Sequence, residues 1–234
     1  MTKNEIVSII IPVYNEQECI ANVIRHLRLH APEHIEIIVS DGGSTDATTA
    51  IASAEGAISV RSPQKGRAAQ MNFGASFATG TILYFLHADC LPPQNFYPEI
   101  IASVNKGFHL GRFQTKFDSN SLLLKLNAVF TRFDWFICYG GDQTLFITTD
   151  AFKKINGFSE DMLIMEDYDI VKRARKQFQY AVLKEKVLVS ARKYKTNSWL
   201  KVQLANRAIV KMYRKGIKQE VLVEKYKRLL DYQY

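Results

Sequence analysis

The sequence predicts an α/β protein with a mixed, mostly parallel sheet flanked by helices and followed by a helical C-terminal extension. Short, continuous apolar runs at residues 6–11, 35–40 and 82–86 are typical of strands buried on both faces of a parallel sheet. Between these runs apolar residues recur at helical spacing, so strand, helix and strand alternate. This alternation predicts a doubly wound half with a nucleotide-sized crevice beyond the carboxyl ends of its strands.

The composition bounds the class of protein. With 234 residues, 47% of them hydrophobic, the chain is long enough for one large domain with its own core. The longest apolar runs fall far short of the roughly 20 residues that a membrane-spanning helix needs. The first residues show no signal-peptide pattern, and Cys19, Cys90 and Cys138 lack the CxxC spacing of a metal or redox site. We therefore expect reduced thiols and a cytoplasmic location.

The net charge of +8 is concentrated toward the end of the chain, where Lys and Arg recur from Lys172 onward. Such a segment can meet a phosphorylated substrate, nucleic acid or an anionic membrane, although a solvated helix face is the commoner explanation. No nucleic-acid signature is present, so no nucleic-acid partner is expected. A peripheral membrane contact through this basic region stays compatible with an enzyme.

The elements of the first half follow from the hydrophobic pattern. The first strand is expected to end at Pro12, because proline cannot donate a ladder hydrogen bond. After the second strand, glycines permit a tight turn, and Ser44 or Thr45 can cap the next helix, with Asp46 at the positive end of its dipole. The expected elements are strands at residues 6–11, 35–40, 58–60 and 82–86, and helices at residues 19–27, 47–54 and 67–79.

Two polar segments of this half are candidates for ligand binding. Asp89 stands just beyond the fourth strand, where a carboxylate can hold a divalent cation shared with a ligand's phosphates; a surface turn before Pro92 is the equal alternative. Lys65 and Arg67 flank Gly66 at a helix start that suits an anion, although an ordinary basic loop explains them too. No GxGxxG follows the first strand and no GxxxxGK[ST] exists, so neither a dinucleotide site nor a P-loop is supported.

The second half of the sequence predicts further strands and helices, and it contains a second group of acidic residues. Two glycines before Asp142 and Gln143 indicate either backbone close to a ligand or a plain turn. Glu166 and Asp167 open a helix whose dipole favours their charged form, so an acid there can be a general base or a simple cap. The expected elements are strands at residues 110–117 (antiparallel), 145–148 and 180–189, an amphipathic segment at 122–137, helices at 94–105, 150–156, 166–174, 198–215 and 218–230, and a cationic loop at 190–195.

Five segments, in this order and spacing over nearly the whole chain, resemble glycosyltransferase family 2 with a GT-A fold. They are Ile9-Ile10-Ile11-Pro12-Val13-Tyr14-Asn15-Glu16, Asp41-Gly42-Gly43-Ser44-Thr45-Asp46, Lys65-Gly66-Arg67, His87-Ala88-Asp89 and Met165-Glu166-Asp167. The resemblance implies an inverting transfer of a sugar from a nucleotide diphosphate donor, with a UDP-sugar favoured, by single displacement and usually with Mg²⁺ or Mn²⁺. It also implies one GT-A domain over residues 1–234, with a nucleotide-binding half (1–90), an acceptor half (91–190) and basic C-terminal helices (191–234).

The resemblance also assigns roles to residues. Asp89 is the expected metal ligand and Asp167 the expected catalytic base. The diphosphate's growing charge would be neutralised by a metal on Asp89 and by nearby cations. The residues expected to bind the nucleotide sugar are Pro12, Tyr14, Glu16, Asp41, Gly43, Lys65, Gly66, Arg67, His87, Ala88 and Asp89, and those expected at the acceptor or diphosphate are Asp142, Gln143, Glu166, Arg192 and Lys195.

The chain departs from the family pattern in two places. His87 replaces the first acid of the DxD motif, which leaves Asp89 as its lone carboxylate. No histidine follows His109, so the downstream histidine ligand of some GT-A enzymes is missing, and metal dependence is less firmly implied than the fold. The lack of a QxxRW motif argues against a processive synthase.

At finer grain, the Gly-Gly-Asp-Gln, Met-Glu-Asp and Ser-Ala-Arg-Lys-Tyr segments are similar to single-domain bacterial proteins named for arsenosugar biosynthesis or for radical-SAM/selenodomain company. That similarity does not fix the acceptor, which is either a small molecule or a lipid-linked one. Two alternatives stay open: a sugar nucleotidyltransferase, and a non-catalytic protein that binds a nucleotide or an anionic surface.

Overall fold

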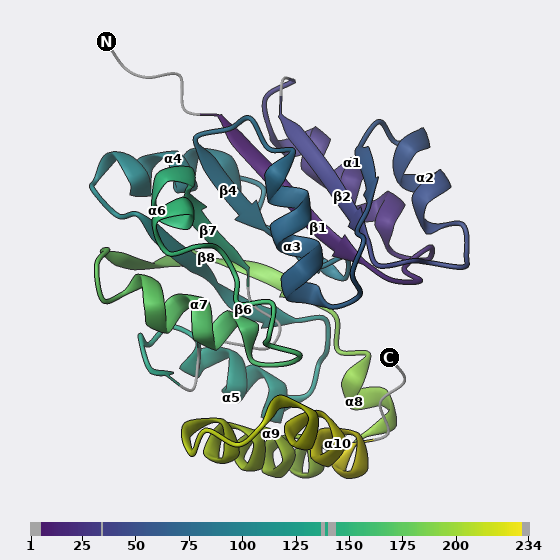
Figure 1. Cartoon of the computed structure of the whole chain (residues 1–234), viewed down its shortest axis with the longest axis vertical. Helices are drawn as coiled ribbons and strands as arrows, with labels where there is room; N and C mark the ends of the chain where they lie inside the picture. Colours follow the sequence, from purple (N-terminus) through teal and green to yellow (C-terminus); the bar gives the residue numbers. More distant parts are fainter. Residues whose placement is uncertain (1–5, 34, 137–138, 140–143, 231–234) are drawn as a thin grey trace.

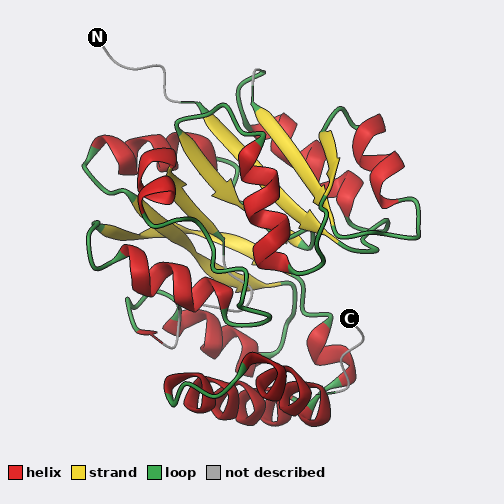
Figure 2. Ribbon diagram, in the orientation of Figure 1, coloured by secondary structure: helices red, strands yellow, loops and turns green. Residues whose placement is uncertain are grey.

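An eight-stranded mixed sheet with helices on both faces forms the body of the computed structural model, which describes residues 6–33, 35–136, 139 and 144–230 (Figures 1 and 2). The strand order is β3-β2-β1-β4-β7-β6-β8-β5, and four of the seven neighbouring pairs are parallel. This confirms the predicted fold class. The strands are β1 (Val7–Val13), β2 (Glu36–Asp41), β3 (Ile58–Arg61), β4 (Ile82–Phe85), β5 (Cys90–Leu91), β6 (Leu110–Phe117), β7 (Leu145–Thr148) and β8 (Tyr180–Val189).

Two apolar cores lie on opposite faces of the sheet, because side chains alternate along each strand. On β1, Ile9 and Ile11 belong to a cluster with α1 (Ile20–His30) and α4 (Phe96–Asn105). The intervening Ile10 belongs to a cluster with α3 (Arg67–Ser76), α6 (Thr149–Lys154) and α7 (Glu166–Ala174), the three helices in front of the sheet in Figure 1. Burial on both faces explains why β1 reads as one continuous apolar run.

The remaining helices lie at the edges of this body. They are α2 (Thr48–Ala54), α5 (Leu122–Phe130), α8 (Lys193–Thr196), α9 (Trp199–Arg214) and α10 (Gln219–Leu229). Helices α9 and α10 pack on each other and form the lower layer in Figure 1. Within the described ranges, no helix combines the length and apolar character that a bilayer crossing requires.

Several predicted boundaries were wrong, and Pro12 is the most instructive. It lies inside β1, opposite Ser40 of β2, rather than after the strand. The Ile10 carbonyl accepts from Leu86 N–H at 3.0 Å on the β4 side, whereas the Val13 carbonyl accepts from Gly42 N–H at 2.9 Å on the β2 side. The backbone N–H and C=O groups of successive strand residues point to opposite neighbouring strands, so those of Pro12 point toward β4. Pro12 lies beyond the last hydrogen bond of the β1–β4 ladder, so its missing N–H leaves no ladder bond unmade.

Other differences concern pairing and caps. β6 pairs antiparallel with β7, as predicted, but makes its longer ladder parallel to β8, which returns through the α7 crossover. Residues 193–196 form α8, which overlaps the end of the predicted cationic loop (190–195), and the helix in the amphipathic segment ends at Phe130. Neither Ser44 nor Thr45 caps α2; the Ser44 hydroxyl instead accepts from Asn15 N–H at 2.9 Å.

Candidate functional site

The polar residues singled out in the sequence lie at one edge of the sheet. β1, β2 and β4 run parallel, and β6 and β8 share their direction, because β7 is antiparallel to both β4 and β6. The chain leaves the carboxyl ends of β1, β2, β4 and β8 at Tyr14, Gly42, Leu86 and Ser190, respectively. The first loop, the Asp41 turn, the His87–Asp89 segment and Arg192 therefore meet at the edge where open α/β sheets bind ligands.

Asp41 organises the turn after β2. Its side chain is only 3% exposed, and its carboxylate accepts from Gly43 N–H at 3.0 Å and Ser44 N–H at 2.9 Å. Gly43 has φ = +95°, a conformation that favours glycine because a Cβ would be strained there. Asp41 is therefore occupied in holding the glycine turn in shape.

Gln70 and Asn15 hold these loops in place, although the sequence alone assigned neither of them a role. Gln70 on α3 is buried, and its amide donates to the Val13 carbonyl at 2.7 Å and the Ser40 carbonyl at 3.0 Å. The Asn15 side chain accepts from Thr45 N–H at 2.9 Å. A signal for Gln70 exists in the sequence: it is a lone amide within the apolar stripe of its helix.

A basic and aromatic shelf lies beside the glycine turn. The Lys65 ammonium stands 5.3 Å from the centre of the exposed Tyr14 ring, in cation–π range. A Cβ added to Gly43 would lie 3.7 Å from both the Arg61 guanidinium and the Lys65 side chain. At Gly66, just before α3, an added Cβ would meet no atom within 4 Å. Positive charge and open space thus coincide at the start of α3, as an anionic ligand requires.

Arg192 joins the loops after β1 and β4. Its guanidinium donates to both Glu16 oxygens at 2.7 and 2.8 Å, and its Nε lies 3.2 Å from Asp89 Oδ2. Arg192 is 50% exposed, whereas the two carboxylates are mostly covered. One cation therefore neutralises two acids that would otherwise repel each other at this edge.

The pKa of the Cys19 thiol depends on the same charges. Burial raises the pKa of its thiol, and Glu16 and Asp89 raise it further, while Arg192 works in the opposite direction. The thiol thus stays protonated and poorly nucleophilic at neutral pH. It is a neighbour of the acidic pair rather than a candidate nucleophile.

The second acidic cluster opens α7. Glu166 is 1% exposed, and Arg67 Nε at the start of α3 lies 2.9 Å from its Oε1, in a charge contact that is not aligned as a hydrogen bond. Asp167 follows in the first turn and is half-buried. Met165, directly before Glu166, has φ = +70°, a left-handed conformation uncommon for a side chain of its size. Arg67 thus ties the acidic turn of α7 to the basic start of α3.

The other predicted residues fall into three groups. Ala88 is buried and His87 half-buried beside Asp89, and Pro12 lies in β1 as described. Lys195 is exposed on α8, three residues after Arg192. Asp142 and Gln143 lie outside the described residues.

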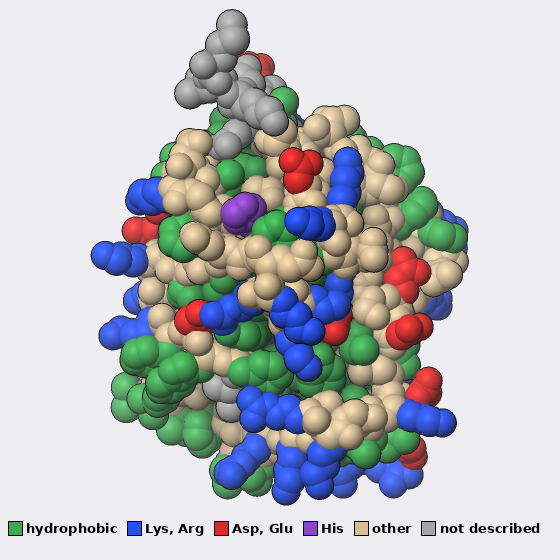
Figure 3. Space-filling model, turned by 60° about the vertical axis from the view of Figure 1, so that its left-hand side comes forward, with side chains coloured by type: hydrophobic (Ala, Val, Ile, Leu, Met, Phe, Trp, Pro, Cys, Tyr) green, Lys and Arg blue, Asp and Glu red, His purple; other side chains and the backbone are tan. Residues whose placement is uncertain are grey.

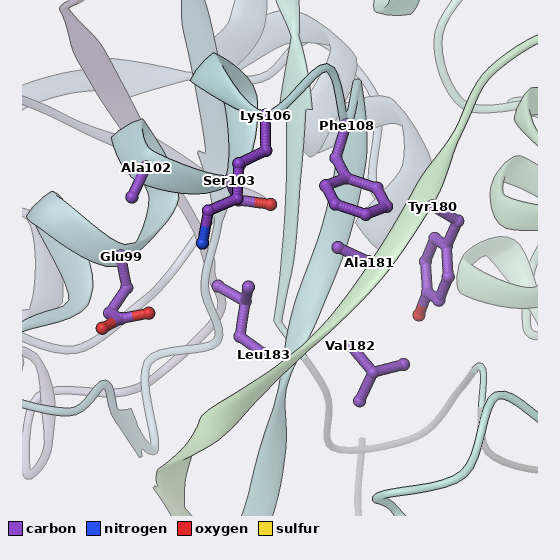
Figure 4. A pocket seen from close by; sticks show the side chains of 9 residues that line it. All are labelled: Glu99, Ala102, Ser103, Lys106, Phe108, Tyr180, Ala181, Val182 and Leu183. Carbon is purple, nitrogen blue, oxygen red and sulfur yellow. The ribbon is translucent and has the colours of Figure 1, made fainter.

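A separate hollow of about 240 Å³ lies between α4 and β8 (Figure 4). Its walls include Tyr180, Ala181 and Leu183, which belong to the amino-terminal end of β8. That end is opposite the edge where Asp89 and Arg192 meet. The hollow is therefore unrelated to the predicted site.

Comparison with known proteins agrees with this geometry. The family described as glycosyl transferase family 2 matches residues 8–154, more than half of the chain. The chain belongs to glycosyl transferase family 2. The mannosyltransferase PcManGT from Pyrobaculum calidifontis, solved with GDP-Man and Mn²⁺, superposes with a TM-score of 0.69 at 17% identity, covering 97% of this chain and 70% of that one. S. aureus TarS 1–349 with UDP-GlcNAc gives 0.68 at 16%, covering 80% and 59%. These likenesses confirm the GT-A fold.

Sequence relatives match a smaller part of the chain. Glycosyltransferase AglE of Haloferax volcanii is 33% identical over 107 residues, which cover 42% of this chain and 35% of AglE. An undecaprenyl-phosphate 4-deoxy-4-formamido-L-arabinose transferase of Klebsiella pneumoniae is 30% identical over 112 residues, covering 44% and 34%. The chain spans about a third of the length of these two relatives.

Proposed function

We propose that this family 2 protein transfers a sugar from a nucleotide diphosphate donor to an acceptor hydroxyl, by a single inverting displacement and non-processively. The observation that carries the proposal is the Glu16–Arg192–Asp89 network at the carboxyl edge of the sheet. It places a cation and two carboxylates beside a basic, aromatic shelf. That combination suits a nucleoside diphosphate and the charge it gains on leaving.

The donor's parts match parts of this edge. Tyr14 offers an aromatic face for the base, and the Asp41 turn shapes the floor beneath the nucleoside. Lys65 and the open start of α3 suit the diphosphate. We propose a UDP-sugar as donor; UDP-GlcNAc bound to TarS and GDP-Man bound to PcManGT show that the fold accepts two nucleotide classes.

The residues at the edge fit a divalent ion shared with the donor. No group of three acid, histidine or cysteine ligands occurs in the parts of the chain that the structure describes. Mg²⁺ needs only one or two carboxylates when phosphates and waters complete its shell, and Asp89, with Glu16 nearby, can supply them. Such an ion would act as a Lewis acid on the diphosphate. Arg192 lies 3.2 Å from Asp89 Oδ2, so an ion held by this carboxylate would compete with the guanidinium, which would then be available to the diphosphate.

Asp167 is the proposed base. Its position in the first turn of α7 suits a carboxylate, because the positive end of the helix dipole favours an anion there. The buried Glu166–Arg67 contact holds that turn in place and leaves the next residue half-exposed. Asp167 would accept the proton of the acceptor hydroxyl while oxygen attacks the anomeric carbon opposite the leaving diphosphate.

The finer assignments rest on the same proposal. Residues 1–90 would bind the donor, residues 91–190 the acceptor side, and residues 191–234 would add cations. Glu166, Arg192, Lys195, Asp142 and Gln143 are proposed at the acceptor or diphosphate. Membership of the bacterial group named for arsenosugar biosynthesis is proposed on the quoted segments alone.

The test compares wild type with Asp89→Ala and Asp167→Asn. We expect nucleotide-sugar turnover with Mn²⁺ in the wild type, loss of metal-dependent nucleotide binding in Asp89→Ala, and binding without turnover in Asp167→Asn. A single-displacement product should show the inverted anomeric signal by NMR. Full turnover by Asp167→Asn would remove the base assignment, and pyrophosphate release from a nucleoside triphosphate would indicate a nucleotidyltransferase instead.

A matched control is available on the same helix. Asp169 also lies in the first turn of α7, where it pairs with Arg173 at 2.7 Å. Asp169→Asn should keep turnover within a few-fold of wild type. A loss equal to that of Asp167→Asn would indicate a general effect of charge at this helix start.

A further inference from the structure

Helix α5 turns its apolar side outward. Leu124 is its one buried side chain, whereas Leu122 is 79% exposed and Leu126 51% exposed. The segment after the helix continues the pattern, with Trp135 51% exposed. We define the α5 face as the exposed apolar side chains Leu122, Leu123, Leu126, Val129, Phe130, Phe133 and Trp135.

The α5 face is one stripe rather than scattered residues. Leu122, Leu126 and Val129 follow each other by four and three residues within α5, which places them on one side of the helix, and Phe133 and Trp135 follow in the segment after it. In α1 the same spacing selects Ile20, Val23 and Leu27, and those side chains are buried in the core. A helix whose apolar stripe faces away from its own core marks an interaction surface.

The outward orientation is fixed by bonds on the inner side. Arg112 on β6 is buried and donates to the Thr131 carbonyl at 2.7 Å and the Phe133 carbonyl at 3.1 Å. The Thr131 hydroxyl accepts from Thr115 N–H at 2.9 Å. A buried cation on the carbonyls just after a helix also complements the negative end of its dipole. The α5 face is therefore held outward by the body of the protein.

Most of the charges around the α5 face are positive; the acids near it are Asp118, before the helix, and Asp134, which pairs with Arg175 at 2.7 Å. Helix α5 contains no acid and one lysine, Lys125, and exposed Arg132 follows it. The neighbouring helix α9 carries four cations and no acid, and its Arg214 lies 4.5 Å from the ring of Phe136. Figure 3 shows apolar side chains gathered at the height of α5, and Lys and Arg along the edge below them.

We propose that the α5 face docks on an anionic lipid bilayer. Leucines that enter the acyl boundary, a Trp–Phe pair stacked at 4.6 Å and flanking cations are the chemistry of an interfacial helix. A second copy of this chain fits less well, because a twofold interface would bring the like-charged α9 helices toward each other. Cations beside the stripe are instead attracted to acidic headgroups.

The docked orientation would bring the candidate site close to the lipid. β6 ends at the same edge as Asp89, and α5 follows it within a few residues. Phe117 at the end of β6 contacts the Tyr194 ring at 5.9 Å, two residues after Arg192. The inference stands apart from the proposed function, because lipid binding is measurable without any sugar donor.

The experiment is co-sedimentation of the full chain with vesicles. Phosphatidylcholine alone is compared with phosphatidylcholine containing about one-third phosphatidylglycerol, at physiological salt and at about 1 M NaCl. We expect binding to the anionic vesicles that weakens with salt. The Leu122→Ser/Leu126→Ser variant should lose about tenfold or more in partition coefficient, while Leu29→Ser, also a highly exposed leucine (77%) but on α1, should bind as wild type.

A second readout locates the contact. In a Trp199→Phe background, emission of Trp135 should shift to shorter wavelength with anionic vesicles and stay unchanged with phosphatidylcholine alone. Equal vesicle binding by the double Leu variant and wild type would overturn the proposal. Absence of binding to anionic vesicles, or a dimer in light scattering that the double variant dissociates, would overturn it as well.

Discussion

Replacing Arg192 with alanine should change two affinities in opposite directions. In the ligand-free protein the guanidinium neutralises Glu16 and Asp89, so its loss leaves two neighbouring carboxylates free to attract a divalent ion. Arg192 is half exposed, and exposed ion pairs contribute about 0.5–1 kcal/mol. Removal of that competition should strengthen Mn²⁺ binding about two- to fivefold in the absence of nucleotide.

The same substitution should weaken the nucleotide. If the guanidinium turns to the diphosphate, the lost charge-assisted hydrogen bonds cost about 1.5–3 kcal/mol, or roughly 10- to 100-fold in affinity for a nucleoside diphosphate with Mn²⁺. Isothermal titration calorimetry measures both affinities. The control is Arg25→Ala, which removes another exposed pair, with Glu55, away from the site.

The direction in which each affinity changes tests this reasoning. Unchanged or weaker Mn²⁺ binding would show that Arg192 does not compete for Asp89. Unchanged nucleotide affinity would show that it does not reach the diphosphate. An independent check is the alkylation rate of Cys19, which should fall at a given pH in Arg192→Ala because the cation that lowers the pKa of its thiol is gone.

Three further predictions concern the framework. Gln70→Leu removes two buried hydrogen bonds and should destabilise the protein by about 1–3 kcal/mol in urea denaturation, whereas exposed Gln177→Leu should be near neutral. Gly74→Ala introduces a better helix former, yet the added Cβ would lie 2.7 Å from Ile10 Cγ2. We therefore expect the free energy of unfolding to fall by about 1–3 kcal/mol, and a higher melting temperature would contradict the close packing of α3 on β1. Burial lowers the pKa of His26 below its ordinary value of 6.5. This effect outweighs that of the hydrogen bond to the Pro92 carbonyl, which raises the pKa. The unfolded chain then binds the proton more readily, so this contribution to stability is complete above pH 6.5 and declines below it; His26→Asn should flatten the melting temperature between pH 7 and pH 5.

Much of the frame was predictable because strands buried on both faces, such as β1 and β4, form continuous apolar runs, and strands with a more exposed face, such as β6 and β8, show alternation. β6, β7 and β8 begin and end where the pattern placed them. The sheet's parallel half also follows, and with it the edge that receives Asp41 and Asp89. A family resemblance carried by separate loops then predicted a site at this edge.

The missing parts depend on contacts that periodicity does not encode. A pattern shows which residues share a side of a helix, but not whether that side meets the core, so α5 looked amphipathic without revealing that its stripe faces outward. The predicted end of β1 at Pro12 was wrong because the ladder between β1 and β4 ends before Pro12, so the strand can continue through a proline. Gln70 and Arg192 act on partners that are distant in the sequence, and no local signal identifies those partners.

The pairing of Glu16 with Arg192 spans 176 positions. The stretch that matches the family ends at residue 154, before α7 and before Arg192. A fragment cut at that boundary would keep four of the five family segments but would lack both the counter-ion of Asp89, the proposed metal ligand, and Asp167, the proposed base. The proposed site therefore extends beyond the family match, because it needs residues from α7 and from the loop after β8.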